Sequence, residues 1–120
     1  MAINRNSDIH DAAAIGFSRA ADAYERGRPE YSEKSVRYVS NRLYLFGSLL
    51  RVVDLAAGTG KFTKILDALS PRLVASLTDV EPVEAMRLKG ESVAPHATFI
   101  SGTAEDIPLA SETCDVVTVA

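Results

Sequence analysis

The segment 51–70, RVVDLAAGTGKFTKILDALS, constrains the fold of this 120-residue chain more than any other. It begins with a short apolar run that ends in an acid, Asp54, and continues into a turn of small residues. After the turn, apolar residues recur at the i, i+3, i+4, i+7 spacing of one helix face, at Phe62, Ile65, Leu66 and Leu69. The segment therefore predicts a buried parallel strand, a tight turn and a helix.

The turn has the properties of an anion-binding site. Gly58 and Gly60 can adopt positive φ without a Cβ clash, and they allow a ligand to approach the backbone closely. The predicted helix begins near Lys61 and directs its free N–H groups, with the positive end of its dipole, toward the turn. The turn therefore suits a ligand with an anionic end, such as a carboxylate or a phosphate.

Spacing separates three nucleotide-binding patterns. A Walker A loop, GxxxxGK[ST], when aligned on Gly60, places Leu55 at its first glycine and Phe62 at its Ser/Thr, so this pattern fails. A dinucleotide fingerprint, GxGxxG, fits Gly58 and Gly60 but places Thr63 where close helix–strand packing favours glycine or alanine. The dinucleotide pattern is weakened, and an NAD-binding protein stays open as an alternative.

The third pattern is D-x-G-x-G-x-G, and the chain reads DLAAGTG over residues 54–60. Here it resembles the class I S-adenosylmethionine-dependent methyltransferases, in particular their small-molecule, UbiE-like and trans-aconitate-methyltransferase-like branch. The resemblance implies that S-adenosylmethionine is the cofactor and that the turn binds it through Asp54, Ala56, Ala57, Gly58 and Gly60. Ala56 departs from the first glycine of the pattern, and we expect it to narrow the turn rather than abolish it.

A second acid, Glu81, follows the next predicted strand, Leu73–Val80. We expect Pro82 to be the first residue of a helix that runs to Gly90. A carboxylate at the end of the second strand of a βαβ unit is placed to bind the hydroxyls of an adenosine ribose. The alternative is that Glu81 only stabilises the N-terminus of the following helix. Asp79 points to the same strand face and is a weaker candidate.

The first 48 residues predict a helical cap, which precedes a cofactor-binding domain over residues 49–120. One amphipathic helix is expected over about residues 8–26. A second helix, with Ser32 as its N-cap, is expected to run to about Phe46, before a glycine.

The end of the first helix is similar to a segment, F…A..Y…RP.Y, at the head of the same methyltransferase branch. In this chain the matching residues lie between Phe17 and Tyr31. The resemblance implies that this segment folds over the cofactor and that Tyr24 and Arg28 approach its methionine end. The alternative is an ordinary amphipathic helix that packs on the core.

A third strand is predicted over residues 98–101, and the loop after it resembles the GDAEDLPF loop of the family. The resemblance implies that Thr103, Ala104 and Glu105 recognise the adenine edge of the cofactor, with Thr103 replacing the commoner aspartate. Ile107 would supply an apolar wall for the purine. The alternative is an acidic surface turn without a ligand.

The last six residues, 115–120, predict a buried fourth strand. The family resemblance implies a seven-stranded sheet of order 3-2-1-4-5-7-6, of which this chain supplies strands 1 to 4. We therefore expect the chain to be the cofactor-binding part of a larger enzyme, with the acceptor pocket elsewhere. An open edge near residues 115–120 would favour self-association.

Composition and charge limit the partners, the metal sites and the cellular location that the chain can have. A net charge of −3 gives no electrostatic argument for a nucleic-acid partner, and no apolar stretch is long enough to predict a membrane span. Cys114 is the only cysteine, which excludes an internal disulfide and a cysteine-rich zinc site. His10 and His96 lack ligands at metal-binding spacing and are expected at the surface. A cytoplasmic protein without a metal is the expectation.

Together these patterns predict an α/β fold, a Rossmann-like parallel sheet with an N-terminal helical cap. The family resemblance implies S-adenosylmethionine-dependent methyl transfer to a small-molecule acceptor that the sequence does not identify. No catalytic residue is predicted, because such a transfer depends mainly on positioning. The alternatives are a fragment that binds cofactor or a partner without turnover, and a fragment of an NAD-dependent oxidoreductase.

Overall fold

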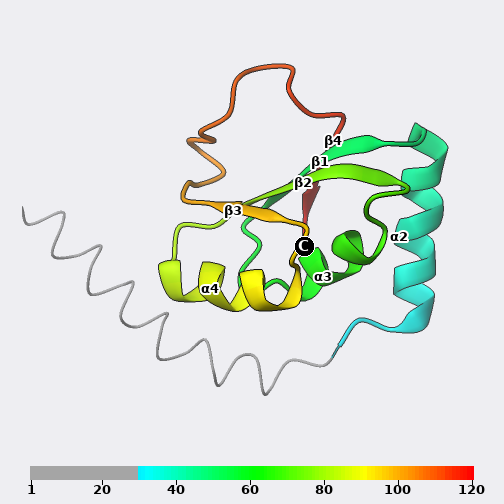
Figure 1. Ribbon diagram of the computed structural model, residues 1–120, viewed down its shortest axis with the longest axis horizontal. Helices are drawn as coiled ribbons and strands as arrows, with labels where there is room; N and C mark the ends of the chain where they lie inside the picture. The colour runs from blue at the N-terminus through cyan, green and yellow to red at the C-terminus, as the bar shows by residue number, and fades with distance from the viewer. Residues whose placement is uncertain (1–29) are drawn as a thin grey trace, which may run out of the picture.

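The structure is a computed structural model and describes residues 30–120 (Figure 1). Its elements are α2 (Glu33–Phe46), β1 (Leu50–Leu55), α3 (Lys61–Ala68), β2 (Val74–Val80), α4 (Glu84–Val93), β3 (Thr98–Ile100) and β4 (Val116–Val119). The helix predicted over residues 8–26 lies outside the described residues, as do the two proposed lid residues, Tyr24 and Arg28.

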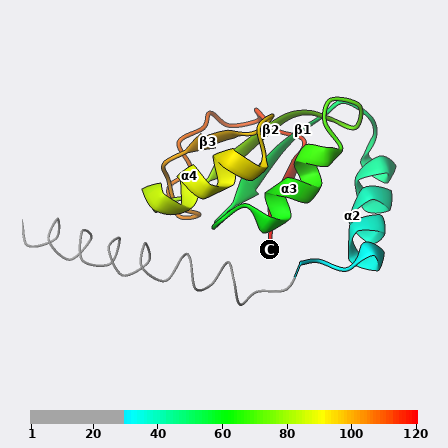
Figure 2. The same cartoon turned by 60° about the horizontal axis from the view of Figure 1, so that its bottom comes forward.

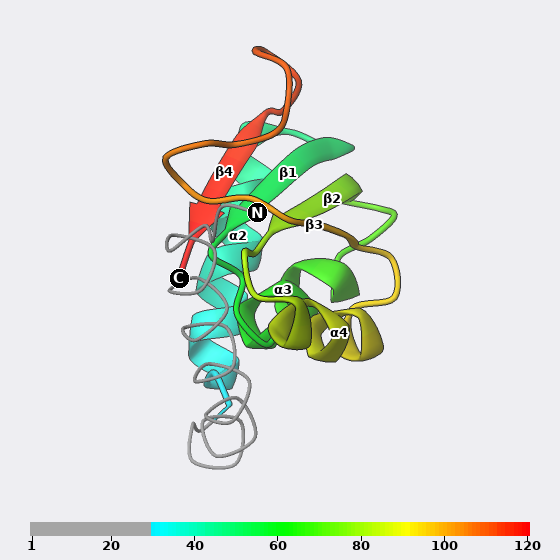
Figure 3. The ribbon, with the colours of Figure 1, turned by 90° about the vertical axis from the view of Figure 1, so that its left-hand side faces the viewer.

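The four strands form one parallel sheet in the order β3-β2-β1-β4 (Figure 3). This arrangement confirms the predicted α/β fold and the expected order 3-2-1-4. In the register of the sheet, Asp54 on β1 lies between Asp79 on β2 and Thr118 on β4. Because all four strands run in the same direction, their carboxyl ends meet at one edge of the sheet.

The two faces of the sheet are covered differently. Helices α3 and α4 lie on one face, with α2 beside α3, whereas the segment 101–115 crosses on the other side (Figures 1 and 2). The helix face carries the larger core cluster, made of Leu43, Leu50, Val52, Leu66, Val74 and Leu77. The other face carries a smaller cluster of Val53, Leu55 and Val80, against which Ile100 and Cys114 pack.

The predicted N-cap of α2 is confirmed. The Ser32 hydroxyl accepts a hydrogen bond of 3.1 Å from the backbone N–H of Ser35, which satisfies one of the free donors of the first turn. Helix α2 ends at Phe46, and Gly47 follows with a φ of 132°. Leu43, which belongs to the same core cluster as Leu50, fastens this helix to the sheet.

Helix α4 differs from its prediction at both ends. It begins at Glu84 after Val83, and it continues to Val93, so the prediction of Pro82 as its first residue and of Gly90 as its end is wrong. At the start, the Val83 N–H donates to the Glu81 carboxylate, and the helix begins only at the next residue, Glu84. Gly90 lies inside the helix because the ring of Phe99 needs the space: a Cβ would lie 2.4 Å from Phe99 Cε1.

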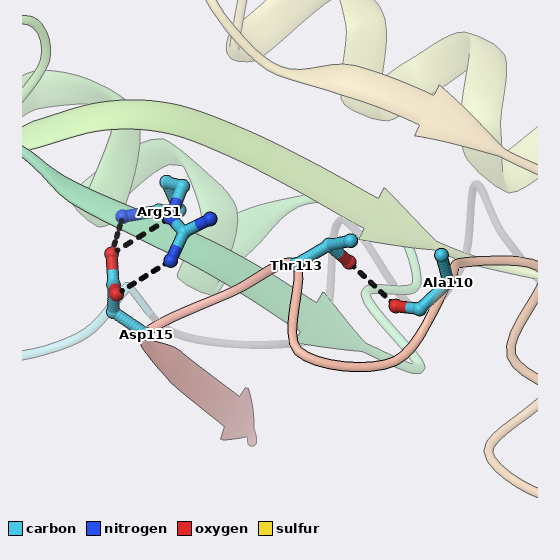
Figure 4. A network of polar contacts seen from close by, with 4 residues as sticks. All are labelled: Arg51, Ala110, Thr113 and Asp115. Carbon is cyan, nitrogen blue, oxygen red and sulfur yellow. Dashed lines mark hydrogen bonds and ion pairs between the residues drawn. The ribbon is translucent and has the colours of Figure 1, made fainter.

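The start of β4 is fastened to the start of β1 by one pair of residues (Figure 4). The Arg51 guanidinium donates from Nε and Nη2 to Asp115, and the backbone N–H groups of both residues donate across the pair at 2.8 Å. These hydrogen bonds lower the pKa of Asp115. The ion pair is exposed and contributes little stability by itself, so its main effect is to align the two strands.

Candidate functional site

The candidate site lies at the carboxyl edge of the sheet, where β1 leads into the turn of residues 56–60 and β2 ends at Glu81. Gaps between parallel strand ends and the following helices are the usual ligand-binding places of such folds. The structure brings the two predicted segments into contact, because the Gly58 N–H donates to Glu81 Oε1 at 2.9 Å.

Three alternate residues of the turn have left-handed backbone conformations. Their φ angles are 55° at Ala56, 60° at Gly58 and 87° at Gly60. Glycine adopts this conformation freely, whereas alanine is destabilised there by about 1–2 kcal/mol. The Ala56 N–H donates to the Val80 carbonyl at 2.9 Å, which fixes the start of the turn. The turn therefore forms with alanine at its first position, but with backbone strain at that residue.

The two glycines of the turn have different surroundings. A Cβ added to Gly58 would meet nothing within 4 Å, so the space beside this residue is open to a ligand. A Cβ added to Gly60 would lie 2.9 Å from the Cα of Gly90 and 3.2 Å from Val93 Cγ2. Gly60 thus allows α3 and α4 to approach each other closely. The sequence assigned both glycines to the ligand and missed this packing role.

The Glu81 carboxylate joins the turn to the start of α4. Its side chain is buried, with Oε1 accepting from the Gly58 N–H and Oε2 accepting from the Val83 N–H at 2.8 Å. The contact with Val83 shows the predicted role at the helix start. Each carboxylate oxygen has a second lone pair, so Glu81 retains the capacity to accept from ribose hydroxyls.

A row of polar side chains is buried directly beneath the turn. Asp54, Thr63 and Asp79 are each at most 1% exposed. Thr118 donates to Asp54 Oδ1 at 2.8 Å, and the Thr63 hydroxyl is 3.0 Å from Asp54 Oδ2 and also contacts Asp79 Oδ2. Asp54, which was predicted to bind cofactor, is therefore held by two threonines. The sequence missed the role of Thr63, whose partners on two strands no local pattern connects.

The two buried acids differ in their affinity for a proton. Burial raises the pKa of Asp54 to about 6, although the hydrogen bonds from Thr118 and Thr63 oppose this shift. Burial raises the pKa of Asp79 to about 8, opposed by Thr63 and assisted by the charges of Asp54 and Asp67. Burial thus favours the protonated form of both acids, and it does so more strongly at Asp79.

The loop after β3 is exposed and held by local hydrogen bonds. The Asp106 N–H donates to both the carbonyl and the hydroxyl of Thr103. Ala104 and Glu105, which lie between these two residues of the loop, are exposed. Ile107 lines a hollow of about 210 Å³ whose other walls include Val53 and Val117. That hollow lies on the sheet face opposite α3.

Gly102, at the start of this loop, has a packing role that the sequence did not predict. A Cβ there would lie 2.6 Å from Pro108 Cδ and 3.0 Å from Val80 Cγ1. The absent side chain lets the loop fold back against the end of β2. The sequence shows only a glycine directly after a predicted strand, and this pattern does not reveal that Pro108 and Val80 lie beside it.

His96 is exposed, as predicted, but it has an unpredicted partner. Its backbone N–H donates to Asp67 Oδ1 at 2.8 Å, and its Nδ1 lies 3.1 Å from Asp67 Oδ2. Within residues 30–120, no cluster of three or more histidine, cysteine or acidic residues could hold a metal ion. No helix of the same part of the chain has the length and apolar character needed to cross a membrane.

The parallel sheet, the glycine turn and the acid at the end of β2 define a Rossmann-like binding domain. A family of methyltransferase domains matches residues 53–120, and the chain belongs to this family. An uncharacterized methyltransferase of Mycobacterium tuberculosis is 36% identical over 107 residues, which are 89% of this chain and 40% of the relative. An uncharacterized methyltransferase-like protein of Schizosaccharomyces pombe is 32% identical over 96 residues, which are 78% of this chain and 35% of the relative.

Solved methyltransferase structures share the fold. An amino pentose methyltransferase from Micromonospora echinaspora with bound S-adenosylmethionine superposes with a TM-score of 0.64 at 22% identity, over 82% of this chain and 40% of that one. The CcbJ methyltransferase from Streptomyces caelestis also gives 0.64, at 20% identity over 83% and 41% of the two chains. The chain thus spans about 40% of the length of several similar proteins.

Proposed function

We propose that this chain is the S-adenosylmethionine-binding part of a methyltransferase that acts on a small molecule. The observation that carries the proposal is the contact between Gly58 and Glu81 in a chain of the methyltransferase family. The contact joins the glycine turn to the acid expected at the ribose, and it leaves open space beside Gly58. A related fold binds S-adenosylmethionine in the amino pentose methyltransferase, which supports the choice of cofactor and of a small acceptor.

In this proposal the turn holds the methionine part of the cofactor, and Glu81 holds the ribose. The open side of Gly58 lets the cofactor lie against the backbone, next to Ala57 and the N-terminus of α3. That helix end favours the carboxylate of the methionine group. The free lone pairs of Glu81 accept from the ribose hydroxyls, as charge-assisted hydrogen bonds.

Other residues complete the proposed site at its two ends. Thr103, Ala104 and Glu105 contact the adenine edge, for which their exposure leaves them available. Tyr24 and Arg28, which lie outside the described residues, contact the methionine end. When bound, S-adenosylmethionine supplies the methyl group. The protein contributes by holding cofactor and acceptor in line and by excluding water, which needs no nucleophilic residue.

Calorimetric titration with S-adenosylhomocysteine and with NAD tests the proposal. We expect S-adenosylhomocysteine to bind and NAD to bind more weakly or not at all, and Gly58→Val to lose the binding. Tighter binding of NAD would favour the oxidoreductase alternative and overturn the proposal. Because the acceptor pocket is expected elsewhere, turnover is tested in a chain extended to the length of the relatives. Binding of S-adenosylhomocysteine by that longer chain without turnover on a panel of small acceptors would favour the non-catalytic alternative.

The exposed side chains of β4 support a second proposal, self-association through this strand. It lies at one edge of the described sheet, and Val117 and Val119 are 52% and 70% exposed. We expect sedimentation to detect dimers or larger species that Val119→Lys reduces. Leu88→Lys, which changes an exposed apolar residue on α4, is the control and should leave the association unchanged. A protein that stays monomeric at high concentration would contradict this proposal. Both proposals assume that the protein acts in the cytoplasm.

A further inference from the structure

Two acids lie next to each other in the centre of the sheet. Asp54 on β1 and Asp79 on β2 are direct neighbours in the register, and both point toward α3, where Thr63 contacts them. Neither acid is more than 1% exposed. Two adjacent carboxylates without a cation would repel each other strongly in such a place.

The number of hydroxyl protons shows how the pair avoids this repulsion. Thr63 has a single hydroxyl proton, which it can donate to only one of the two carboxyl groups that it contacts. The other contact requires a carboxyl group that donates its own proton to the Thr63 oxygen. One of the two acids must therefore be protonated when both contacts exist.

The surrounding hydrogen bonds identify Asp79 as the protonated acid. Asp54 has a hydroxyl donor at each oxygen, Thr63 at Oδ2 and Thr118 at Oδ1, which suits an ionised carboxylate. Asp79 Oδ1 is buried and has no hydrogen-bond partner among residues 30–120. A charged oxygen in that position would be strongly destabilised, whereas a neutral carboxyl group is tolerated.

The charges around Asp79 act in the same direction. The charged groups that act on its pKa are Asp54 on β1 and Asp67 on α3, and both are acids that raise it. On β3 the register partner is Phe99, which has no charge. Burial is the largest cause and raises the pKa of Asp79 to about 8, and none of the described side chains that shift this pKa is a cation.

We propose that Asp79 is a positioning residue, a protonated acid whose donated hydrogen bond, relayed by Thr63, holds Asp54 and the glycine turn in the ligand-binding arrangement. Both acids are connected to the turn through the backbone. Ala56 follows Asp54 by two positions, and its N–H is bound by the carbonyl of Val80, the residue after Asp79. Ionisation of Asp79 removes the donated bond and sets two charges against each other beneath the turn. The part of the inference that concerns the ligand depends on the proposed function.

A protonated Asp79 makes the free energy of unfolding depend on pH. The folded state retains the Asp79 proton up to about pH 8, whereas an unfolded chain releases it near pH 3.8. Between these values the folded state binds more protons, so the free energy of unfolding decreases as the pH rises. Asp79→Asn keeps a neutral donor in the same shape and removes this decrease.

The direct test is carbon-13 NMR of the aspartate carboxyl groups in the labelled protein at pH 7. We expect one signal at the shift of a protonated carboxyl group, absent in Asp79→Asn and retained in Glu91→Gln, a control at an exposed position on α4. An Asp79 signal at the shift of a carboxylate would overturn the proposal, and this measurement on the wild-type protein does not depend on whether a variant folds.

Two further measurements separate this proposal from the proposed function. The melting temperature of the wild type should decrease from pH 5 to pH 8.5 more than that of Asp79→Asn, and parallel profiles would contradict the proposal. At pH 8.5 about a quarter of the wild type still has a protonated Asp79, so Asp79→Asn should bind S-adenosylhomocysteine up to about fourfold more tightly than the wild type, with equal affinity at pH 6. Equal affinities at both pH values overturn the relay to the turn. Failure of every protein to bind at any pH overturns the proposed function and the relay, whereas the NMR shift still decides the position of the proton.

Discussion

The glycine turn and the loop after β3 both lie near the carboxyl edge of the sheet, but they are held in different ways. The turn is held from outside, by Glu81 and by the Val80 carbonyl, across more than twenty residues of sequence. The loop is held mainly within itself, by the hydrogen bonds between Thr103 and Asp106. If the turn and the loop bind the cofactor as proposed, binding and folding use the same atoms in the turn, whereas in the loop they are largely separate.

This difference predicts how substitutions behave in the two regions. Changes in the turn should alter both the free energy of unfolding and the affinity for cofactor. Changes at the exposed tip of the loop should alter affinity alone, because these side chains make few contacts in the folded protein. The following substitutions test the comparison, beginning with the largest expected effect.

Gly60→Val should have the largest effect, a loss of about 3 kcal/mol or more in the free energy of unfolding. The added side chain meets the backbone of Gly90 at 2.9 Å and must adopt a φ of 87°. Chemical denaturation measures the loss. Gly58→Val is the matched control: its side chain has open space, so it should lose cofactor binding with a smaller loss of stability. Equal unfolding midpoints for the two variants would contradict the packing role of Gly60.

Glu81→Gln should weaken both properties of the turn. It removes the charge that strengthens the bonds from Gly58 and Val83, and it places an amide N–H₂ near one of these donors. We expect cofactor affinity to decrease by about 1.5–3 kcal/mol, roughly ten- to a hundredfold, in a calorimetric titration. Normal affinity with a lower melting temperature would mean that Glu81 acts only on the helix and the turn.

Ala56→Gly should stabilise the protein by about 0.5–1 kcal/mol, because glycine tolerates the positive φ that strains alanine. Ala57→Gly is the control, since no positive φ occurs at that position, and it should destabilise by a similar amount. Thermal unfolding of the two variants gives opposite shifts if the strain is real. A destabilised Ala56→Gly variant would show that the turn prefers alanine for another reason.

Glu105→Gln should have the smallest effect on folding, within about 0.5 kcal/mol, because Glu105 is exposed. If the loop recognises adenine, affinity for S-adenosylhomocysteine should still decrease several-fold. A decrease in melting temperature comparable to that of Glu81→Gln would remove the distinction between the two regions. Unchanged affinity would exclude Glu105 from the site.

The parts of the fold that were predictable from the sequence are those that local patterns specify. The strand–turn–helix unit at residues 50–68 follows from an apolar run, two glycines and helical spacing. The N-cap at Ser32 follows from side-chain chemistry three residues ahead of its partner. The strand order required the family resemblance, because periodicity alone does not determine which strands are neighbours.

The unpredicted features depend on contacts between distant residues. Thr63 was treated as a misfit in a glycine pattern, and only the register of β1 and β2 shows the two acids that it joins. Gly90 was taken as a helix end because the position of the Phe99 ring is invisible in the sequence. The roles of the ligand-contacting residues stay predictions, since their test is binding.

The pairing of Arg51 with Asp115 determines more than the attachment of β4. It sets Val116 opposite Val52, so Thr118 lies opposite Asp54 and donates to it. If β4 slipped by one position, every side chain would move to the other face, and Asp54 would lose one of its two donors. An exposed ion pair at one end of the strand therefore sets the register on which a buried hydrogen bond near the other end depends.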